Sequence, residues 1–556
     1  MCHNETINRT DRIILKIREG HMLSRLLLTF TPLVFLIAIP VLLQPHSVTE
    51  TISGSDHLII ITPHAEPIKY EFEHAFRKYY REEFGRDVAL DWRSPGGTSD
   101  IVRYINDRFE ASFRQCWESN PENGKWSKDI AGAFTNYRLD RPSPDTPPDS
   151  LKARKMFLSS EVGIGIDLFF GGGAYDHAKH ADKGYAVDAG IQKLHPDWFT
   201  DERIPREFSG ENLYDRQGRY YGVCLASFGI CYNVDRIKSM RESSPPATWH
   251  DLGEARFLRQ IAIADPTKSG SINKCFEMLI QETMSEAVAK DGPDARSAGW
   301  ADGLNLIKRI AANSRYITDS AGKVPQDVAN GDTAAGMCID FYGRTEAEWT
   351  EMQSGSNRVV YVSPRNGTSV SPDPIQLLRG SQNPQAARAF IEFVLSREGQ
   401  KLWNFKVGTP GGPIKYALRR TPIRKDMFVP EYQRYLSDAG YDPYQASQGF
   451  KYHADWTGPY FGLIRTMIKC IALDPQPELN RAWEEITMAG GPGAVPQAMA
   501  EFNRLPFGYA EAAKNSSRLY PGKDWTMLDV IRLRREWTEE SRQNYMKAAS
   551  LAQEGK

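Results

Sequence analysis

The stretch Val88-Ala-Leu-Asp-Trp-Arg-Ser-Pro-Gly-Gly-Thr-Ser99 predicts a strand, a tight turn and the start of a helix. Residues 88–92 have the apolar alternation of a strand, and the apolar residues after the turn recur at helical spacing. Such a turn directs unpaired backbone N–H groups and the positive end of a helix dipole at one point, and its hydroxyl groups add donors. The stretch therefore predicts an anion-binding turn in an α/β fold.

The same arrangement occurs a second time, far along the chain. Asp265-Pro-Thr-Lys-Ser-Gly-Ser271 follows an apolar strand at 261–264 and precedes a second helical pattern. A turn of Ser, Thr and Gly before a helix is also an ordinary N-cap, so each turn alone fits both interpretations. Two such turns facing each other would form a clamp for one ligand.

The elements around these turns indicate a sheet with crossover helices. An apolar strand at 58–61, a helix at 68–84 and the strand at 88–92 predict parallel pairing, with ligands at the carboxyl ends of the strands. Two long extended runs, 220–233 and 358–364, are suited to crossing between two lobes. The polar, Pro-rich residues 114–150 predict a surface insertion.

Composition excludes some functions. The 556 residues include 69 Lys and Arg against 70 Asp and Glu, so the chain has no excess of positive charge that would attract nucleic acid. The seven cysteines show no CxxC spacing, and His177 and His180 form only a pair of helical spacing, which is more typical of a solvated helix face than of a metal site. The apolar segment 26–43 predicts an export signal or a membrane anchor. We expect no cofactor and no metal.

Five segments together carry a resemblance to a known family: Leu58 to His64, Pro95 to Ser99, Ala226 to Asn233, Asp265 to Gly270 and Ala387 to Gln400. In these segments the chain resembles the family 1 bacterial extracellular solute-binding proteins of ABC importers, and most closely the branch with the ferric-iron-binding proteins. The resemblance implies an α/β, bilobed periplasmic-binding-protein-like fold of type II. Two parallel or mixed sheets would be flanked by helices. The resemblance covers about residues 56–424, and the tail beyond it departs from the family; its own pattern predicts a helical C-terminal extension.

The two crossing segments and the extent of the resemblance together predict domain boundaries. We expect an N-terminal tail, signal or anchor segment and linker at 1–55, and lobe 1 at 56–225 plus 364–425. Lobe 2 would comprise 226–363, and the helical extension 426–556. Transferred position by position, the ligand-binding residues would be Thr62, His64, Gly97, Thr98, Ser99, Gly172, Ser227, Ser269, Gly270, Ser271, Asp340, Tyr342 and Asp373.

The predicted function is that of an extracytoplasmic protein that captures a small solute between two lobes and delivers it to a membrane permease. Opposed helix N-termini favour a phosphate, phosphonate, sulfonate or carboxylate group. Ferric iron is an alternative, because the family's iron-binding branch uses adjacent tyrosines and this chain has two such pairs, at 79–80 and 220–221. An enzyme is a further alternative, although the common catalytic motifs are missing from the sequence. So is a tethered sensor or docking protein.

Overall fold

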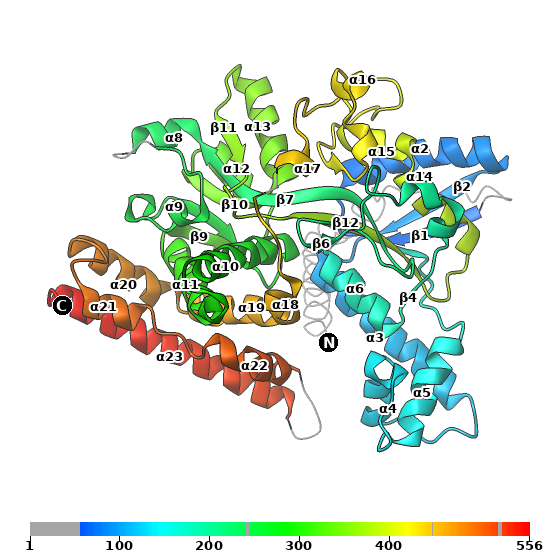
Figure 1. Cartoon of the computed structure of the whole chain (residues 1–556), viewed down its shortest axis with the longest axis horizontal. Coiled ribbons are helices and arrows are strands. Elements are labelled where there is room, and N and C mark those ends of the chain that lie inside the picture. The colour runs from blue at the N-terminus through cyan, green and yellow to red at the C-terminus, as the bar shows by residue number, and fades with distance from the viewer. Residues whose placement is uncertain (1–55, 241–243, 447–448, 521–524) are drawn as a thin grey trace, which may run out of the picture. The chain divides into compact units, whose positions relative to one another are not determined.

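In the computed structural model, which describes residues 56–240, 244–446, 449–520 and 525–556, strand β7 (Tyr221–Asn233) connects two hydrophobic cores (Figure 1). The predicted N-terminal tail with its apolar segment 26–43 lies outside these residues. Within them, no helix is long and apolar enough to cross a membrane.

Strand β7 changes partners half-way along its length. Its first half pairs antiparallel with β12 (Val370–Leu378) and β13 (Thr421–Pro422). From Phe228 onward it pairs antiparallel with β10 (Ala335–Ile339) and β11 (Val359–Val362). The chain therefore crosses from one core to the other along β7, and it returns through the residues between β11 and β12.

The first core surrounds the N-terminal half of the sheet. Strands β2 (Val88–Arg93), β1 (Asp56–Ile61) and β3 (Leu168–Phe170) pair in parallel, and β12 joins β3 antiparallel. Leu58 and Ile60 face α2 (Glu66–Phe84), α14 (Pro384–Leu395) and α15 (Arg397–Asn404). Ile61 faces the opposite side with α3 (Thr98–Glu118), close to α6 (Ala174–Lys183). This alternation is what a sheet covered by helices on both faces requires.

The predicted surface insertion packs on the face of the sheet that α3 covers. It forms α4 (Lys128–Ala133) and α5 (Pro148–Ser159), which bury Trp117, Phe134 and Phe157. Arg154 is buried as well and donates to the Asp140 carboxylate at 2.8 and 3.0 Å.

The second core surrounds the other half of the sheet. Strand β10 pairs in parallel with β8 (Ile261–Ala264), and β8 with β9 (Ser314–Thr318). Helices α10 (Gly270–Asp291), α11 (Arg296–Ala312), α12 (Lys323–Ala329) and α13 (Asp340–Ser354) pack around these strands. The six described cysteines are free thiols.

The C-terminal helices divide between the cores. Residues near α16 (Pro430–Gln433) and α17 (Pro443–Ala446) pack against the first core and beside Phe405. From Phe450 onward the chain joins the second core. It forms α18 (Ala454–Thr457), α19 (Phe461–Ile468), α20 (Gln476–Met488), α21 (Pro496–Phe502), α22 (Ala512–Arg518) and α23 (Met527–Gln553).

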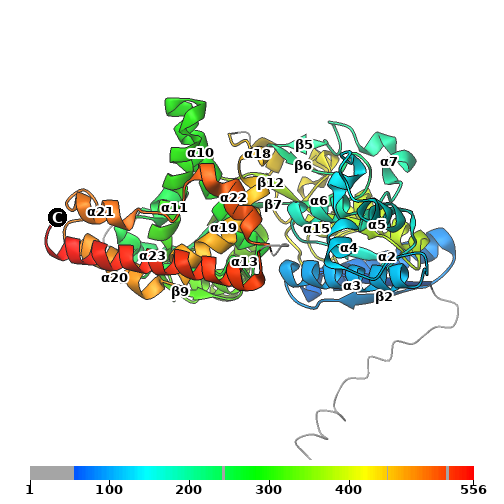
Figure 2. The same cartoon turned by 90° about the horizontal axis from the view of Figure 1, so that it is seen from below.

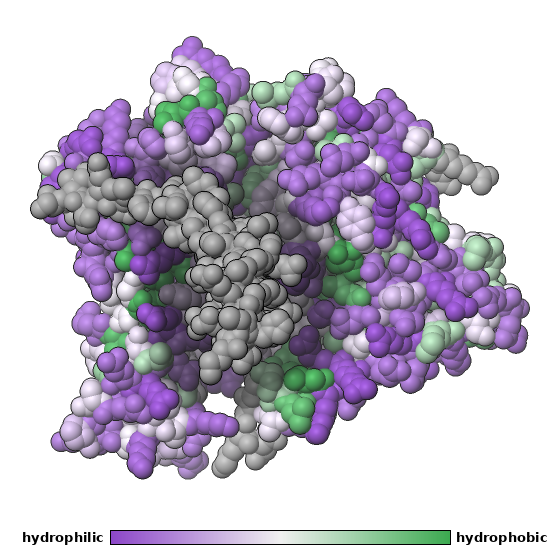
Figure 3. Space-filling model, turned by 180° about the vertical axis from the view of Figure 1, so that it is seen from behind, coloured by the Kyte–Doolittle hydropathy of each residue, from purple (hydrophilic) through white to green (hydrophobic). Residues whose placement is uncertain are grey.

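The figures show this arrangement from several sides. In Figure 2 the first-core elements α2 and α3 lie on one side, α10, α11 and α23 on the other, and β7 and β12 between them. The face shown in Figure 3 is mostly hydrophilic, with apolar residues in small groups. The predicted α/β bilobed fold with a helical C-terminal extension is confirmed. The two predicted sheets share β7 and are thus continuous.

Candidate functional site

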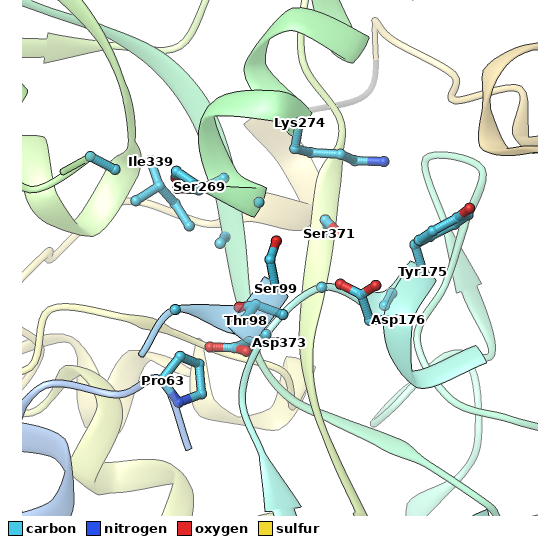
Figure 4. A pocket seen from close by; sticks show the side chains of 18 of the residues that line it. Pro63, Thr98, Ser99, Tyr175, Asp176, Ser269, Lys274, Ile339, Ser371 and Asp373 are labelled. Carbon is cyan, nitrogen blue, oxygen red and sulfur yellow. Dashed lines mark hydrogen bonds between the residues drawn. The ribbon is translucent and has the colours of Figure 1, made fainter. Parts of the chain in front are cut away.

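A cavity of about 1020 Å³ lies between the two cores (Figure 4). On the first-core side its walls come from the starts of α2, α3 and α6, and on the second-core side from the starts of α10 and α13. Parts of β7 and β12 also line it. In Figure 4, Thr98, Ser99 and Asp373 lie on one side of this space, and Ser269 and Lys274 on the other.

The two predicted turns meet at this cavity. A Cβ atom added at Gly97 would lie 3.3 Å from the backbone oxygen of Lys268, so the turn before α3 touches the turn before α10. The backbone N–H groups of Thr98, Ser99, Gly270 and Ser271 have no hydrogen-bond acceptor among the described residues. Free N–H groups at two helix starts can both bind one anionic group placed between them.

Glycines make the close packing around the first turn possible. Gly96 has a φ of 152°, and a Cβ there would lie 2.4 Å from the Asp100 carboxylate. In the triple glycine after β3, a Cβ at Gly171 would lie 2.5 Å from His64 Nε2, and one at Gly172 would lie 2.9 Å from Thr98 Cγ2. The sequence left open whether this segment approaches a ligand or a neighbouring element. The structure shows that it approaches neighbouring side chains, and Gly172 also lines the cavity.

A buried ionic network lies on the first-core side. His64 Nε2 is 3.0 Å from Asp373 Oδ2, and Arg420 Nη1 donates to the same oxygen. Burial would raise the pKa of Asp373, but Arg420 holds it well below its usual range, while burial lowers the pKa of His64. Arg420 is therefore the counter-charge of Asp373. The other oxygen, Asp373 Oδ1, is buried without a hydrogen-bond partner among the described residues.

A second network lies one turn into α10. Lys274 Nζ is 2.8 Å from Glu211 and 2.9 Å from Glu277. Burial would lower the pKa of Lys274, but these two carboxylates raise it well above its usual range. The Glu277 carboxylate also accepts hydrogen bonds from Tyr452 at 2.8 Å and Thr457 at 2.6 Å. The ammonium group is thus charged and already paired.

The structure brings most of the predicted site residues together. Ten of the thirteen line the cavity: His64, Gly97, Thr98, Ser99, Gly172, Ser269, Gly270, Ser271, Tyr342 and Asp373. Their contact with a ligand stays a prediction.

Three of the predicted residues do not line the cavity: Thr62, Ser227 and Asp340. The Thr62 side chain is fully buried, and its Oγ1 accepts from the His64 N–H at 3.1 Å. Ser227 donates from N and Oγ to Asp340 Oδ2, at 3.1 and 3.3 Å. Because β7 changes partners at Ser227, this pair fastens the point where the chain crosses between the cores.

Sequence reasoning missed several residues of the cavity wall. Lys274 was detectable, because it follows Gly270 by four residues and so lies above it on the same helix face. No local pattern marks Arg420, Tyr452 or Arg534, which reach the cavity from segments outside the predicted turns.

The structure gives little support to a metal site. No group of three or more His, Cys, Asp or Glu side chains in the described part of the chain is placed to hold a metal ion. Of the adjacent tyrosines, Tyr79 and Tyr80 pack against aromatic side chains of the first core. Tyr220 lines the cavity, whereas Tyr221 is buried in the first core.

The expectation that His177 and His180 lie on a solvated helix face is wrong. His177 and His180 are both buried, and His177 stacks on Phe169 with ring centroids 4.3 Å apart. His177 Nε2 donates to the Gly171 carbonyl at 3.0 Å, so the ring supports the glycine turn.

Part of this chain is similar in sequence to known proteins. Residues 160–438 match the family model of the bacterial extracellular solute-binding proteins. The phosphoglycerate transport regulatory protein PgtC of Salmonella typhimurium is 25% identical over 180 residues, which are 32% of this chain and 39% of that protein. An uncharacterized protein of Haemophilus influenzae is 23% identical over 237 residues, 42% of this chain and 60% of that protein. This chain thus matches only about two fifths of the length of PgtC.

Two solved structures of bacterial proteins are similar to this chain. The periplasmic binding protein AfuA of Actinobacillus pleuropneumoniae, with fructose-6-phosphate bound, is 17% identical, with 71% of this chain and 95% of that chain covered and a TM-score of 0.42. Iron-bound HitA of Pseudomonas aeruginosa is 15% identical, with 74% and 98% covered and a TM-score of 0.44. Since the family model matches half of its residues, this chain belongs to the bacterial extracellular solute-binding proteins, as the resemblance of its sequence predicted.

Proposed function

We propose that this protein binds a small phosphate ester in the cavity between the two cores and delivers it to the membrane permease of an ABC importer. The observation that carries the proposal is the meeting of two helix starts, at 97–99 and 269–271, in one cavity with free backbone N–H groups and hydroxyl groups. Such a set of donors replaces the water lost by a phosphate group when it enters the cavity.

The remaining part of the ligand would contact other polar groups of the wall. Asp373 Oδ1, buried and without a partner among the described residues, is suited to accept a hydrogen bond from a ligand hydroxyl group. A hydroxylated or carboxylated phosphate ester would use both kinds of group. The name of the similar protein PgtC, which refers to phosphoglycerate transport, is in keeping with this class of solute.

The mechanism we propose is closure about the crossing segments. Lobe 1, at 56–225 plus 364–425, and lobe 2, at 226–363, would swing about β7 near Ser227, and the extension 426–556 would follow the core that each of its parts contacts. Ligand stabilises the closed state because only that state offers donors from both sides. Release to the permease would require the lobes to open. We place this activity outside the cytoplasm.

Binding without chemical change is part of the proposal. Five of the six carboxylates that line the cavity are each paired with a cation, which leaves them poorly suited to act as a general base: Asp100, Glu211, Glu277, Asp319 and Asp373. Asp176 is the exception, with a pKa that burial raises. We therefore expect a phosphate ester recovered from the protein to be unchanged. The appearance of a hydrolysis or transfer product by phosphorus NMR would contradict this.

A thermal-shift screen of the full-length protein tests the proposal. The probes are 3-phosphoglycerate, fructose-6-phosphate, inorganic phosphate, ferric citrate, spermidine and mannitol. A phosphate ester at about 100 times its Kd should stabilise the protein by about 2.7 kcal/mol. We expect Thr98→Val and Ser271→Ala each to weaken this binding several-fold without lowering the melting temperature of the free protein. Stabilisation only by ferric citrate, spermidine or mannitol would refute the phosphate-ester assignment.

A further inference from the structure

The C-terminal extension forms part of the cavity wall. Tyr452, Ala454, Gly458, Phe461, Lys469 and Arg534 all line the cavity. They lie beyond residue 438, where the match to the family model ends. The binding cavity of this protein is therefore built in part from a segment outside the family match.

Buried hydrogen bonds fix this part of the extension to the second core. Asn273 Nδ2 donates to the Phe461 carbonyl at 2.9 Å, and Gln281 Nε2 donates to Thr457 Oγ1 at 2.7 Å. Thr457 donates in turn to Glu277 at 2.6 Å. Because Asn273, Glu277 and Gln281 are all on α10, helix α19 is held in place relative to the turn at which α10 begins.

The same helix also reaches across to the first-core side. Arg465 Nη1 donates to Ser99 Oγ at 3.1 Å, directly at the start of α3. One turn earlier on α19, the Phe461 ring lies 5.1 Å from the ring of Tyr175, at the start of α6. Arg465 thus lies beside two of the helix starts that form the cavity.

The cations around the cavity fall into two groups. Five lining cations have a carboxylate within ion-pair distance: Arg103 with Asp100, Lys268 with Asp319, Lys274 with Glu211 and Glu277, Arg420 with Asp373, and Lys469 with Asp474. Arg534 lines the cavity and Arg465 lies beside it, and neither has a described carboxylate within ion-pair distance, although Arg465 is near enough to Asp176 to oppose the rise that burial causes in the pKa of that carboxyl. The two cations around the cavity that lack an ion-pair partner among the described residues therefore both come from the extension.

We propose that Arg465 and Arg534 of the C-terminal extension are specificity-determining residues that bind the anionic group of the ligand. This inference rests on the proposed function, which it extends by naming the charged partners of the phosphate. Arg465 would share the phosphate with the N–H groups at the start of α3. A guanidinium group holds two phosphate oxygens at once, which the ammonium groups of the paired lysines do not. The extension is thus what makes the cavity selective for an anion over a neutral solute.

Isothermal titration of the full-length protein with 3-phosphoglycerate and with inorganic phosphate tests this assignment. We expect Arg465→Gln and Arg534→Gln each to weaken binding of these anions at least tenfold and to reduce its dependence on salt concentration. Arg465→Lys keeps the charge and should lose less than Arg465→Gln. The matched control is Arg532→Gln, because Arg532 is on the same helix as Arg534, pairs with Asp529 at 3.5 Å and does not line the cavity. It should bind as the unchanged protein does.

The outcomes separate this inference from the proposal on which it rests. If both Gln variants bind within twofold of the unchanged protein while Thr98→Val is weakened, the helix starts hold the anion and the role of the arginines is refuted. If the unchanged protein binds no phosphate-containing probe, the proposed function and this inference both fail. Melting temperatures of the free variants show whether the fold is retained, and a loss of affinity in a variant that melts normally supports the inference.

Discussion

The two sides of the cavity use the same device, a helix start with free N–H groups, but support it in different ways. On the first-core side, Gly97 has no side chain and touches the opposite turn at Lys268, and Ser99 bonds to Arg465 of the extension. On the second-core side, Ser269 Oγ accepts from the Ile272 N–H at 3.3 Å and lies 3.1 Å from the Ser271 hydroxyl. The first turn has contacts across the cavity in addition to its own bond from the Gly97 N–H to the Asp100 carboxylate at 3.2 Å, whereas the second is held mainly by its own serine side chains.

The ionic networks of the two sides differ in a similar way. On the first-core side, Asp373 has one cationic partner, Arg420, and a histidine whose pKa is lowered by burial. On the second-core side, Lys274 forms ion pairs with two carboxylates, Glu211 and Glu277. These carboxylates also accept hydrogen bonds from the hydroxyl groups of Ser369, Tyr452 and Thr457. Without its cation, the first network would keep only His64 beside Asp373, and the second would keep three hydroxyl donors for its two carboxylates.

The largest expected effect follows from removing the cation of the first network. Arg420→Met leaves the buried Asp373 carboxylate with only His64 beside it, and burial opposes protonation of that histidine, so we expect the free energy of unfolding to fall by about 3–5 kcal/mol. Lys274→Met removes the cation that two buried carboxylates share, but hydroxyl donors remain on both, so we expect its loss to be no larger than that of Arg420→Met. Urea unfolding at pH 7 measures both changes.

A second substitution tests the cause of that loss. In the double variant Arg420→Met, Asp373→Asn the unpaired charge is gone, so at least half of the lost stability should return. A double variant no more stable than Arg420→Met, or a larger loss in Lys274→Met, would show that the two networks do not differ as the structure indicates.

Much of the fold and of the cavity follows from local sequence patterns. The apolar run at 58–61 lies in β1, because a strand covered on both faces must be apolar on both. The alternating run at 88–92 lies in β2, which is at the edge of the sheet and half-buried. The glycine-hydroxyl turns were placed correctly since they sit at strand ends and helix starts, which are local features. The ten predicted residues that line the cavity come mostly from such positions.

What the sequence did not reveal depends on long-range packing. The spacing of His177 and His180 on one helix face was correct, but whether that face points to water depends on the sheet beneath it, where Phe169 covers His177. The aromatic residues of the insertion at 114–150 are too sparse to form a periodic pattern, although several are buried. The contact of Arg465 with Ser99 joins positions 366 residues apart, so no local pattern marks it.

The two sides also differ in buried histidines, because all three of those among the described residues, His64, His177 and His180, lie on the first-core side. Burial lowers the pKa of His177 to about 4 and also lowers those of His64 and His180. The unfolded chain takes up a proton at His177 near its ordinary pKa of about 6.5, and the folded protein only near pH 4. Folding stability is therefore lost as the pH falls from about 6.5 to 4, by about 3 kcal/mol for this residue alone.

His177→Phe isolates this contribution, since the new ring retains the stacking on Phe169. We expect the variant to lose about 1 kcal/mol at pH 7, because the Gly171 carbonyl loses its donor. Between pH 6.5 and 4 its stability should then fall by about 3 kcal/mol less than that of the unchanged protein. Urea unfolding at several pH values gives both curves, and parallel curves would mean that His177 does not account for the acid sensitivity.

The smallest expected effect is also the most direct test of how the turns differ. Gly97 has φ −72° and ψ 175°, which any residue adopts, so a methyl group there acts only through its contact with the Lys268 carbonyl, 3.3 Å away. A methyl group at Gly270 meets no atom within 4 Å. We expect Gly97→Ala to weaken phosphate-ester binding about threefold, or about 0.6 kcal/mol, and Gly270→Ala to leave it unchanged. Gly97→Val should separate the turns further and cost at least about tenfold, with a more open protein by small-angle scattering. Equal losses at both glycines would mean that the turns do not touch when the ligand is bound, since only a contact across the cavity distinguishes the two positions.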